Sequence, residues 1–170
     1  LFNRRGTEII QVLIEHGIDV NAVDKYHQNV LFDCNDPDSI RLLIAHGANV
    51  NQTNREGRNA LFNRYDADVV QVLLQHGADV HHRDINDQTA LFVCNDLNVA
   101  KVLMDYGADV NARDKDGRTV LFECNQPEII QLCIAHGANM NAQNCDGKTA
   151  LFGRWDIEVT KVLIESGIDV

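Results

Sequence analysis

The 170-residue chain lacks the features that would mark it as a membrane protein or a nucleic-acid binder. No apolar run approaches the ~18 residues that a membrane-spanning helix needs. Basic residues are few: 15 Lys and Arg stand against 25 Asp and Glu, which gives a net charge of −10. Phosphate backbones repel such a chain unless its cations are segregated. We therefore expect binding neither to a membrane nor to a nucleic acid.

Motifs for catalysis are missing as well. The chain contains no G-x-S-x-G nucleophile elbow, no Walker loop and no H-E-x-x-H zinc motif. The run Asp114-x-Asp116-Gly117 is similar to the start of a calcium-binding loop, but Ala112 stands where such a loop requires its first carboxylate. We therefore predict no catalytic residue, no cofactor and no metal ion in this chain.

The cysteines do not form a disulfide framework. There are five, an odd number, and Cys34, Cys94 and Cys124 recur at one position of a sequence repeat. Free thiols that are mostly buried are typical of a reducing compartment, so we expect a cytoplasmic protein. Cys145 differs from the others because it falls in a turn, where we expect it to be exposed.

What the chain does have is a strict repeat of 30 residues, read most clearly in Leu91–Val120. A Leu-Phe pair opens each of six copies, and these pairs contain all six phenylalanines. The copies start at Leu1, Leu31, Leu61, Leu91, Leu121 and Leu151. A fixed period of this length is typical of a stacked repeat array. We expect residues 1–170 to form a single repeat domain.

Each copy reads as a short helical segment followed by a longer helix. In the fourth copy, Thr89 is a natural cap for the short segment, and Asn95-Asp96 ends that segment and caps the next helix. An apolar stripe runs from Val99 to Met104 at helical spacing, and Gly107 ends the helix. One unit cannot cover its own stripe, so neighbouring units must stack on it. The fold class predicted is therefore an all-α solenoid, in which the first helix of each pair is shorter than the second.

This pattern resembles the ankyrin repeat. The likeness is close at Gly77-Ala-Asp-Val80, at residues 107–112 (GADVNA) and at residues 114–119 (DKDGRT). Two departures are that Phe92 and its counterparts stand where the family has His, and that each copy is three residues shorter than the family's usual length of about 33. The loss falls at the end of the first helix. The resemblance implies stacked helix-turn-helix units with turn or β-hairpin fingers.

For function, the resemblance implies a protein–protein interaction module that binds through its concave face and turn tips. The short repeats are also similar to those of some bacterial proteins delivered into host cells. The alternative is therefore a targeting or substrate-recruiting domain of a larger effector enzyme, acting in the host cytoplasm. The chain begins at Leu1 and stops at Val170, both within a copy. We expect a monomeric fragment of a longer protein, whose two ends open first in hydrogen exchange.

A column of histidines has two interpretations. His16, His46, His76 and His136 each precede a glycine at the end of the longer helix. A row of histidines is compatible with metal binding, but successive members are one repeat apart, too far to share an ion bound at ~2 Å. We favour the other interpretation, in which each histidine interacts with the C-terminal end of its helix.

The positions that vary between copies are the candidates for partner binding. After Leu-Phe-x, three copies read Cys-Asn, whereas three read Arg followed by a large or basic residue. Either the arginines serve alternative packing around the short segment, or they and their aromatic neighbours face a partner, because such residues dominate interface hot spots. The turn tips vary too. The candidate partner-binding residues are Tyr26, Arg55, Arg58, Arg64, Tyr65, Ile85, Lys115, Arg118, Arg154 and Trp155.

The charge pattern indicates what kind of partner these residues would meet. The five inter-helical segments (22–28, 52–58, 82–88, 112–118 and 142–148) hold eight Lys/Arg and seven Asp/Glu, a net charge of +1. The remainder holds seven against eighteen, a net charge of −11. We therefore expect a protein partner with an acidic or mixed-charge surface at the edge formed by these segments.

Overall fold

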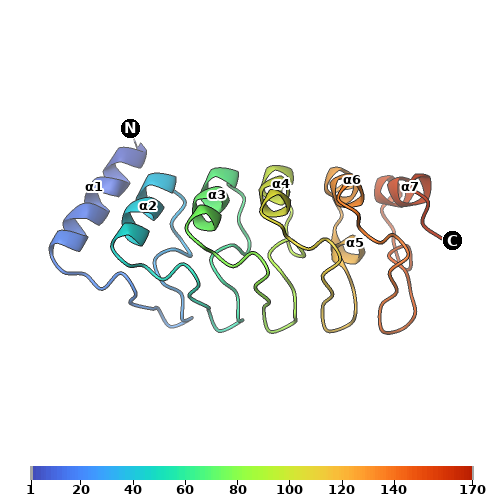
Figure 1. The fold of residues 1–170 in the computed structure, drawn as a ribbon, viewed down its shortest axis with the longest axis horizontal. Helices are drawn as coiled ribbons and strands as arrows, with labels where there is room; N and C mark the ends of the chain where they lie inside the picture. The colour runs from blue at the N-terminus through green and yellow to red at the C-terminus, as the bar shows by residue number, and fades with distance from the viewer. Residues whose placement is uncertain (1, 170) are drawn as a thin grey trace.

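In the computed structural model the chain is a row of stacked layers, with helices along one edge and turn-rich loops along the other (Figure 1). The structure describes residues 2–169, with side chains from residue 6 onward. That range contains no strand and seven helices: α1 (Phe2–Glu15), α2 (Pro37–Ala45), α3 (Ala67–Gln75), α4 (Leu97–Asp105), α5 (Val120–Glu123), α6 (Pro127–Ala135) and α7 (Ile157–Glu165). The predicted all-α solenoid is confirmed.

A layer consists of a short segment, a long helix and the finger that follows it. The α1 layer spans residues 2–28, and the α2, α3, α4 and α6 layers span 29–58, 59–88, 89–118 and 119–148; the α7 layer spans 149–169. Consecutive layers pack through their long helices, from α1 to α2 and on to α7. None of the helices within residues 2–169 is both long and apolar enough to cross a membrane.

The long helices start and end at the residues that the sequence indicated. In four layers an aspartate carboxylate accepts a backbone N–H of the first turn: Asp36, Asp66, Asp96 and Asp156. Gln126 takes this place before α6 and makes no side-chain capping bond, but Pro127 follows at the first helical position. The helices end before glycines with positive φ, such as Gly77 at 87°. In the α1 layer Gly6 stands at the capping position, and α1 runs through it from Phe2 to Glu15.

In every copy after the one that forms α1, the first helix is shortened more than we expected. In the copies that start at 31, 61, 91 and 151 it is a single turn, and only α5 in the copy starting at 121 is a helix, of four residues. The turn is closed by the N–H of Phe32 donating to the carbonyl of Asn29 at 3.1 Å. The three residues that each copy lacks amount to nearly one helical turn, so no second turn can form.

We expected threonine to cap the short segment, and the Thr89 hydroxyl accepts the N–H of Phe92 at 3.4 Å, whereas the Thr119 hydroxyl is buried and makes no hydrogen bond among the described residues. Asn29 and Asn59 occupy the same position, and the side chain of each both accepts and donates a hydrogen bond. The Oδ1 of Asn29 accepts the N–H of Leu31, and its Nδ2 donates to the carbonyl of Asn49 at 2.9 Å. Asparagine can bond both ways because its amide both accepts and donates.

The fingers contain turns, and a ladder of backbone hydrogen bonds joins their tips. Each tip donates an N–H to a carbonyl of the preceding finger: Arg55 to Tyr26, Ile85 to Glu56, Lys115 to Asn86 and Cys145 to Asp116, at 2.8 to 3.0 Å. The contact is close: a Cβ on Gly57, where φ is 71°, would lie 3.1 Å from the nitrogen of Ile85. A glycine at this position therefore suits both the backbone conformation and the spacing of the fingers.

The core is one continuous apolar column that runs from the α2 layer to the α7 layer, with α1 packed against its end. At one position of the long helix, Leu43, Leu73, Leu103, Cys133 and Leu163 are each exposed by 3% or less. The buried residues join into a single cluster from Leu31 to Ile168. Each layer is therefore stabilised mainly by its two neighbours. The expectation that Leu1 and Val170 open first in hydrogen exchange falls on residues outside those described.

Leu103→Ala tests whether stability depends on this column. Leu103 is 0% exposed, so truncation should lower the free energy of unfolding by about 2–5 kcal/mol through lost burial and the cavity left behind. Lys101→Ala on the exposed side of the same helix is the control and should change it by less than about 0.5 kcal/mol. Urea denaturation measures both. Equal midpoints for Leu103→Ala and the unmutated chain would contradict this account of the core.

Candidate functional site

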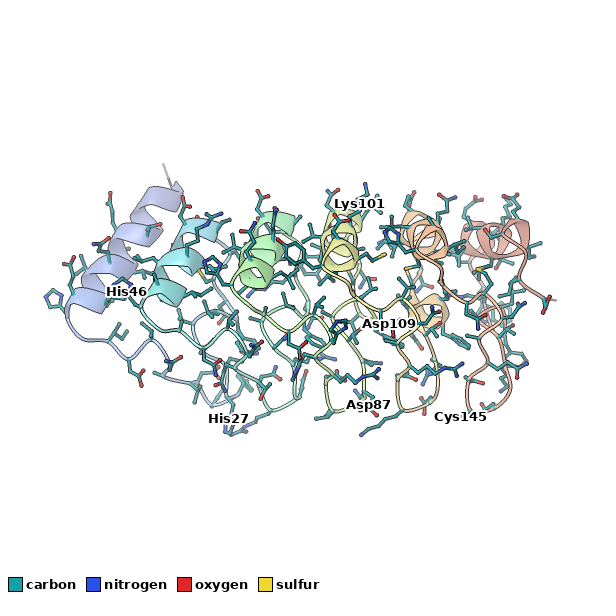
Figure 2. All side chains as sticks on the ribbon, viewed as in Figure 1. His27, His46, Asp87, Lys101, Asp109 and Cys145 are labelled. Atoms are coloured by element: carbon teal, nitrogen blue, oxygen red, sulfur yellow. The ribbon has the colours of Figure 1, made fainter. Side chains whose placement is uncertain are left out.

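The finger tips carry four of the ten candidate residues. Tyr26 and Ile85 are 52% and 55% exposed, and Arg55 and Lys115 are exposed as well. Asp87 and Cys145 mark this edge in Figure 2, opposite Lys101 on the helix side. The tip ladder fixes the spacing of these residues because it holds the backbone of each finger to the next. The structure thus presents Ile85 between the tips that carry Arg55 and Lys115.

Two other candidate arginines are held within the fingers by ion pairs. The Nε of Arg58 donates to Asp84 at 3.0 Å, and a second contact reaches Glu56. The side chain of Asp84 is fully buried, so Arg58 neutralises a buried charge. Arg118 pairs with Asp114, Asp116 and Glu123, and its hydrogen bond to Asp116 raises the pKa of its guanidinium. By contrast, Arg55 and Lys115 have no ion pair within the described residues.

Arg64 occupies an interior position. It is 6% exposed, and its guanidinium donates to the carbonyls of Leu31 and Cys34 and to the Oδ1 of Asn35, all in the preceding layer. Its Nε donates to the carbonyl of Ala60 at 2.7 Å. Burial lowers the pKa of Arg64. These contacts match the packing interpretation and remove Arg64 from the residues that a partner can reach directly.

Arg154 makes the same set of hydrogen bonds to the preceding layer, three layers further on. We call this set of bonds the arginine bracket. It donates to the carbonyls of Leu121 and Cys124 and to the Oδ1 of Asn125, and it is half-buried. Both arginines follow a residue with positive φ, namely Asn63 at 57° and Gly153 at 79°. The sequence contained this signal, because Asn or Gly precedes the arginine in these two copies whereas Asp33, Val93 and Glu123 precede the cysteines. We singled out the arginines from the sequence, but we did not predict the left-handed backbone conformation of the residue before each of them.

The two aromatic candidates are open to solvent. Tyr65 is 72% exposed and Trp155 is 94% exposed, each directly after one of the bracketing arginines. Large exposed aromatic side chains without an intramolecular packing role are typical of contact sites. Because Arg64 and Arg154 directly precede these two residues, their hydrogen bonds to the preceding layer hold the backbone next to each ring.

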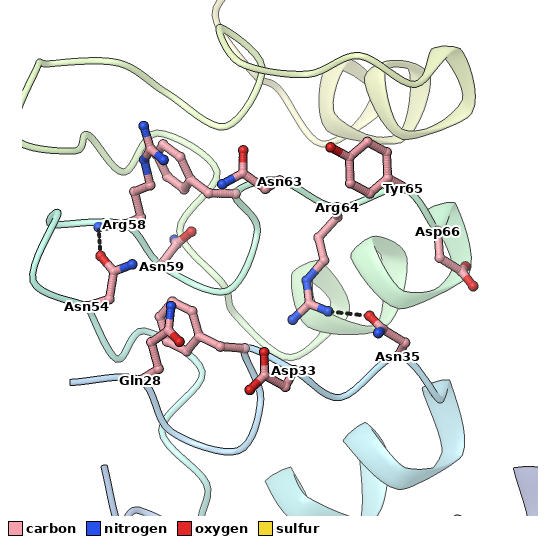
Figure 3. Close-up of a pocket in the computed structure, with 12 residues that line it drawn as sticks. Gln28, Asp33, Asn35, Asn54, Arg58, Asn59, Asn63, Arg64, Tyr65 and Asp66 are labelled. Carbon is pink, nitrogen blue, oxygen red and sulfur yellow. Dashed lines mark hydrogen bonds between the residues drawn. The ribbon is translucent and has the colours of Figure 1, made fainter. Parts of the chain in front are cut away.

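Two clefts lie where the short segments meet the finger ends. The first has a volume of about 510 Å³, and Gln28, Phe32, Arg58, Phe62 and Asn63 are among its lining residues (Figure 3). The second, of about 450 Å³, lies three layers on and is lined at corresponding positions by Arg118, Phe122, Lys148 and Phe152. The phenylalanines that replace the family's histidine thus line both clefts. Both volumes are in the range of ligand-binding pockets.

The histidine column lies at the helix ends, as we favoured. In His16, His46, His76 and His136, Nδ1 lies 2.7 to 2.9 Å from the carbonyl four residues earlier. Each ring therefore bonds a carbonyl in the last turn of its helix, and that carbonyl also accepts the backbone N–H of the same histidine. In the described part of the chain, no three His, Cys, Asp or Glu side chains are grouped so as to hold a metal ion.

Four of the five thiols are shielded. Cys94, Cys124 and Cys133 are buried, and Cys34 is half-buried, whereas Cys145 on a finger tip is exposed. Burial raises the pKa of Cys94 to about 11 and that of Cys133 to about 12, and it also raises the pKa of Cys34 and Cys124. A thiolate in these apolar surroundings would lose its hydration, so the neutral thiol is favoured.

Comparison with known families agrees with the geometry. A model described as ankyrin repeats in three copies matches residues 32–114, 58–144 and 94–170. The chain belongs to the ankyrin repeat family. A search of curated proteins for sequence relatives returned no match. Ankyrin repeats are in general protein–protein interaction modules and are typically not catalytic.

We predict that Arg64→Met lowers the free energy of unfolding by about 2–4 kcal/mol, because the carbonyls of Leu31 and Cys34 lose a charged donor inside the protein. Arg64→Lys should not restore it, since one ammonium group cannot reproduce the planar fork of donors. Arg55→Met, on an exposed finger tip, is the matched control. Chemical denaturation measures all three, and an Arg64→Met protein as stable as the control would disprove the bracket.

The cysteines give a second prediction, on chemical labelling. At pH 8 the raised pKa and burial of Cys94 and Cys133 leave almost no accessible thiolate, so iodoacetamide should modify the exposed Cys145 first. In denaturant all five cysteines should react. Peptide mass spectrometry over time distinguishes them. Labelling of Cys94 or Cys133 as fast as Cys145 in the native protein would contradict the burial.

Proposed function

We propose that this ankyrin repeat chain binds a protein partner through its finger tips and the adjoining face that carries the two clefts. The observation that supports this most is the row of exposed residues at the tips, where Ile85 lies between cationic neighbours on a backbone held by hydrogen bonds. Ile85 is 55% exposed on an ordered tip, and a partner would cover this apolar surface. Recruitment of substrate for a larger effector enzyme would use the same surface.

The charges indicate the chemistry of the partner. Arg55 and Lys115 have no internal counter-ion within the described residues, whereas Arg58 and Arg118 are engaged by carboxylates of the fingers. The complement proposed is therefore a protein surface with an apolar contact for Ile85 and a carboxylate on either side of it. The Arg55 and Lys115 contacts would be exposed and long-range, so they would mainly speed association and weaken with salt.

Tyr65 and Trp155 extend this surface toward the clefts. Because the Arg64 and Arg154 brackets hold the backbone beside them, little conformational entropy remains to be lost when a partner covers these rings. We propose them as the aromatic contacts of the interface, with Arg64 and Arg154 as positioning residues behind them.

A pull-down from cell lysate followed by affinity measurement tests the proposal. Ile85→Asp and Tyr65→Ala should each weaken binding of the captured partner by about 1–3 kcal/mol, because both side chains are exposed contacts outside the core. Their thermal midpoints should stay close to that of the unmutated chain. Replacing Arg55 and Lys115 with alanine should slow association and flatten its salt dependence.

The matched controls are Gln71→Ala and Lys101→Ala, both exposed on the long helices at the opposite edge. They should leave binding unchanged. If instead the two helix variants abolished binding while Ile85→Asp and Tyr65→Ala kept full affinity, the partner would bind the helix side and the proposed surface would be incorrect.

A further inference from the structure

The first cleft is distinguished by side-chain amides that have bonding groups to spare. Gln28 and Asn35 line it from residues 28–35, and Asn54 and Asn63 line it from residues 54–66 (Figure 3). Within the described residues, the side chains of Gln28 and Asn63 make no hydrogen bond. Asn35 and Asn54 use only their Oδ1, which leaves both of their NH₂ groups free. Free donors thus line both walls, together with two free acceptors.

The cleft carries no net charge to attract an ion. Its carboxylates are Asp33 and Asp66, and its cations are Arg58 and Arg64. Arg58 is already paired with Asp84 and Glu56, and Arg64 faces backbone carbonyls of the preceding layer. An anionic ligand therefore gains little here, whereas a ligand with uncharged donors and acceptors can bond to the amides.

An extended polypeptide has that chemistry. Its peptide N–H and C=O groups are unbonded, whereas those of a helix are satisfied within the helix. Aromatic surface is present to cover the ligand: the half-buried Phe32 and Tyr65, which is 72% exposed, both line the cleft. By contrast, Phe62 is 7% exposed and lies beneath the Arg58 guanidinium. The volume of about 510 Å³ accommodates a short stretch of chain.

We propose that this cleft binds an extended, uncharged polypeptide segment through the segment's backbone amides. The inference rests on the proposed function, since the segment would belong to the protein partner. Beyond the proposed function, the inference specifies the conformation and the chemistry of the segment that is bound. Gln28 and Asn63 bond the peptide groups, Phe32 contacts the segment from within the cleft, and Tyr65 packs over it.

The second cleft provides an internal comparison. At the positions of Gln28 and Asn63 it has Arg118 and Gly153, and its lining includes Asp116, Glu123 and Lys148. This cleft has a similar architecture and keeps the amide of Asn144 at the position of Asn54, but it lacks the open amides of Gln28 and Asn63. The proposal therefore applies to the first cleft alone, and it predicts that the two clefts differ in what they bind.

The test uses peptides selected from a displayed library of random 12-residue sequences on the full chain. The variant is Gln28→Met/Asn63→Gly, which removes both open amides while glycine keeps the positive φ at position 63. Gln88→Met is the matched control, because Gln88 occupies the position of Gln28 two layers on and lies outside the first cleft. Thermal midpoints confirm that each variant is folded.

The selected peptides should bind the double variant at least tenfold more weakly and bind Gln88→Met unchanged. N-methylation of a central peptide nitrogen should cost at least tenfold in affinity, and the side-chain NH₂ signals of Gln28 and Asn63 should shift in NMR spectra on binding. Equal binding to the double variant, indifference to N-methylation or a selection that returns no peptide would each overturn the inference.

Failure here is distinguishable from failure of the proposed function. If Ile85→Asp abolishes binding of the captured partner while Gln28→Met/Asn63→Gly does not, the tip surface stands and the cleft inference is rejected. If neither Ile85→Asp nor the double variant weakens binding of that partner, the proposed function fails and the cleft inference fails with it.

Discussion

Stacking of one layer on the next is the interaction on which the whole structure depends. A single short segment and nine-residue helix cannot cover its own apolar stripe, and the column from Leu43 to Leu163 is buried because each layer packs against its neighbours. The apolar residues that recur at 30-residue intervals follow from this, since each long helix must present the same stripe to its neighbours. Variation is therefore confined to positions outside the stack, which are the finger tips and the ends of the short segments.

Polar side chains hold adjacent layers in register around this apolar column. Asn21, Asn51 and Asn111 each accept an N–H and donate to a carbonyl in the next layer, and Asn141 accepts one from Asp169. His81 occupies this position in the α3 layer, and its side chain makes no such bond among the described residues. Two of the layer contacts carry an arginine bracket in addition, at Arg64 and Arg154. The contact between the α3 and α4 layers lacks both devices, but the Arg83 guanidinium donates to the carbonyl of Arg113 across it at 2.6 Å, beside the apolar packing and the finger ladder.

The same devices explain why the proposed binding surface is ordered without being buried. The ladder fixes the tips, and the brackets fix the segments beside Tyr65 and Trp155, so exposed side chains project from a rigid backbone. A partner would then meet a preorganised surface, which lowers the entropy cost of association. The shortened first helix contributes as well, because replacing it by a single turn leaves the phenylalanines lining clefts between finger and segment.

The sequence by itself determined the period, the long helices with their caps, the buried column and the exposed tips, because these depend on local patterns repeated six times. Only the tertiary structure decided the roles of the arginines. Arg58 and Arg64 look equally available in the sequence, yet one neutralises the buried Asp84 and the other donates to carbonyls of the preceding layer. It likewise decided that Gln28 and Asn63 line one cleft with unused amides. These outcomes depend on which polar groups come within hydrogen-bond distance of each other. The residues concerned are about 30 positions apart in the sequence, so they meet only once the layers have stacked.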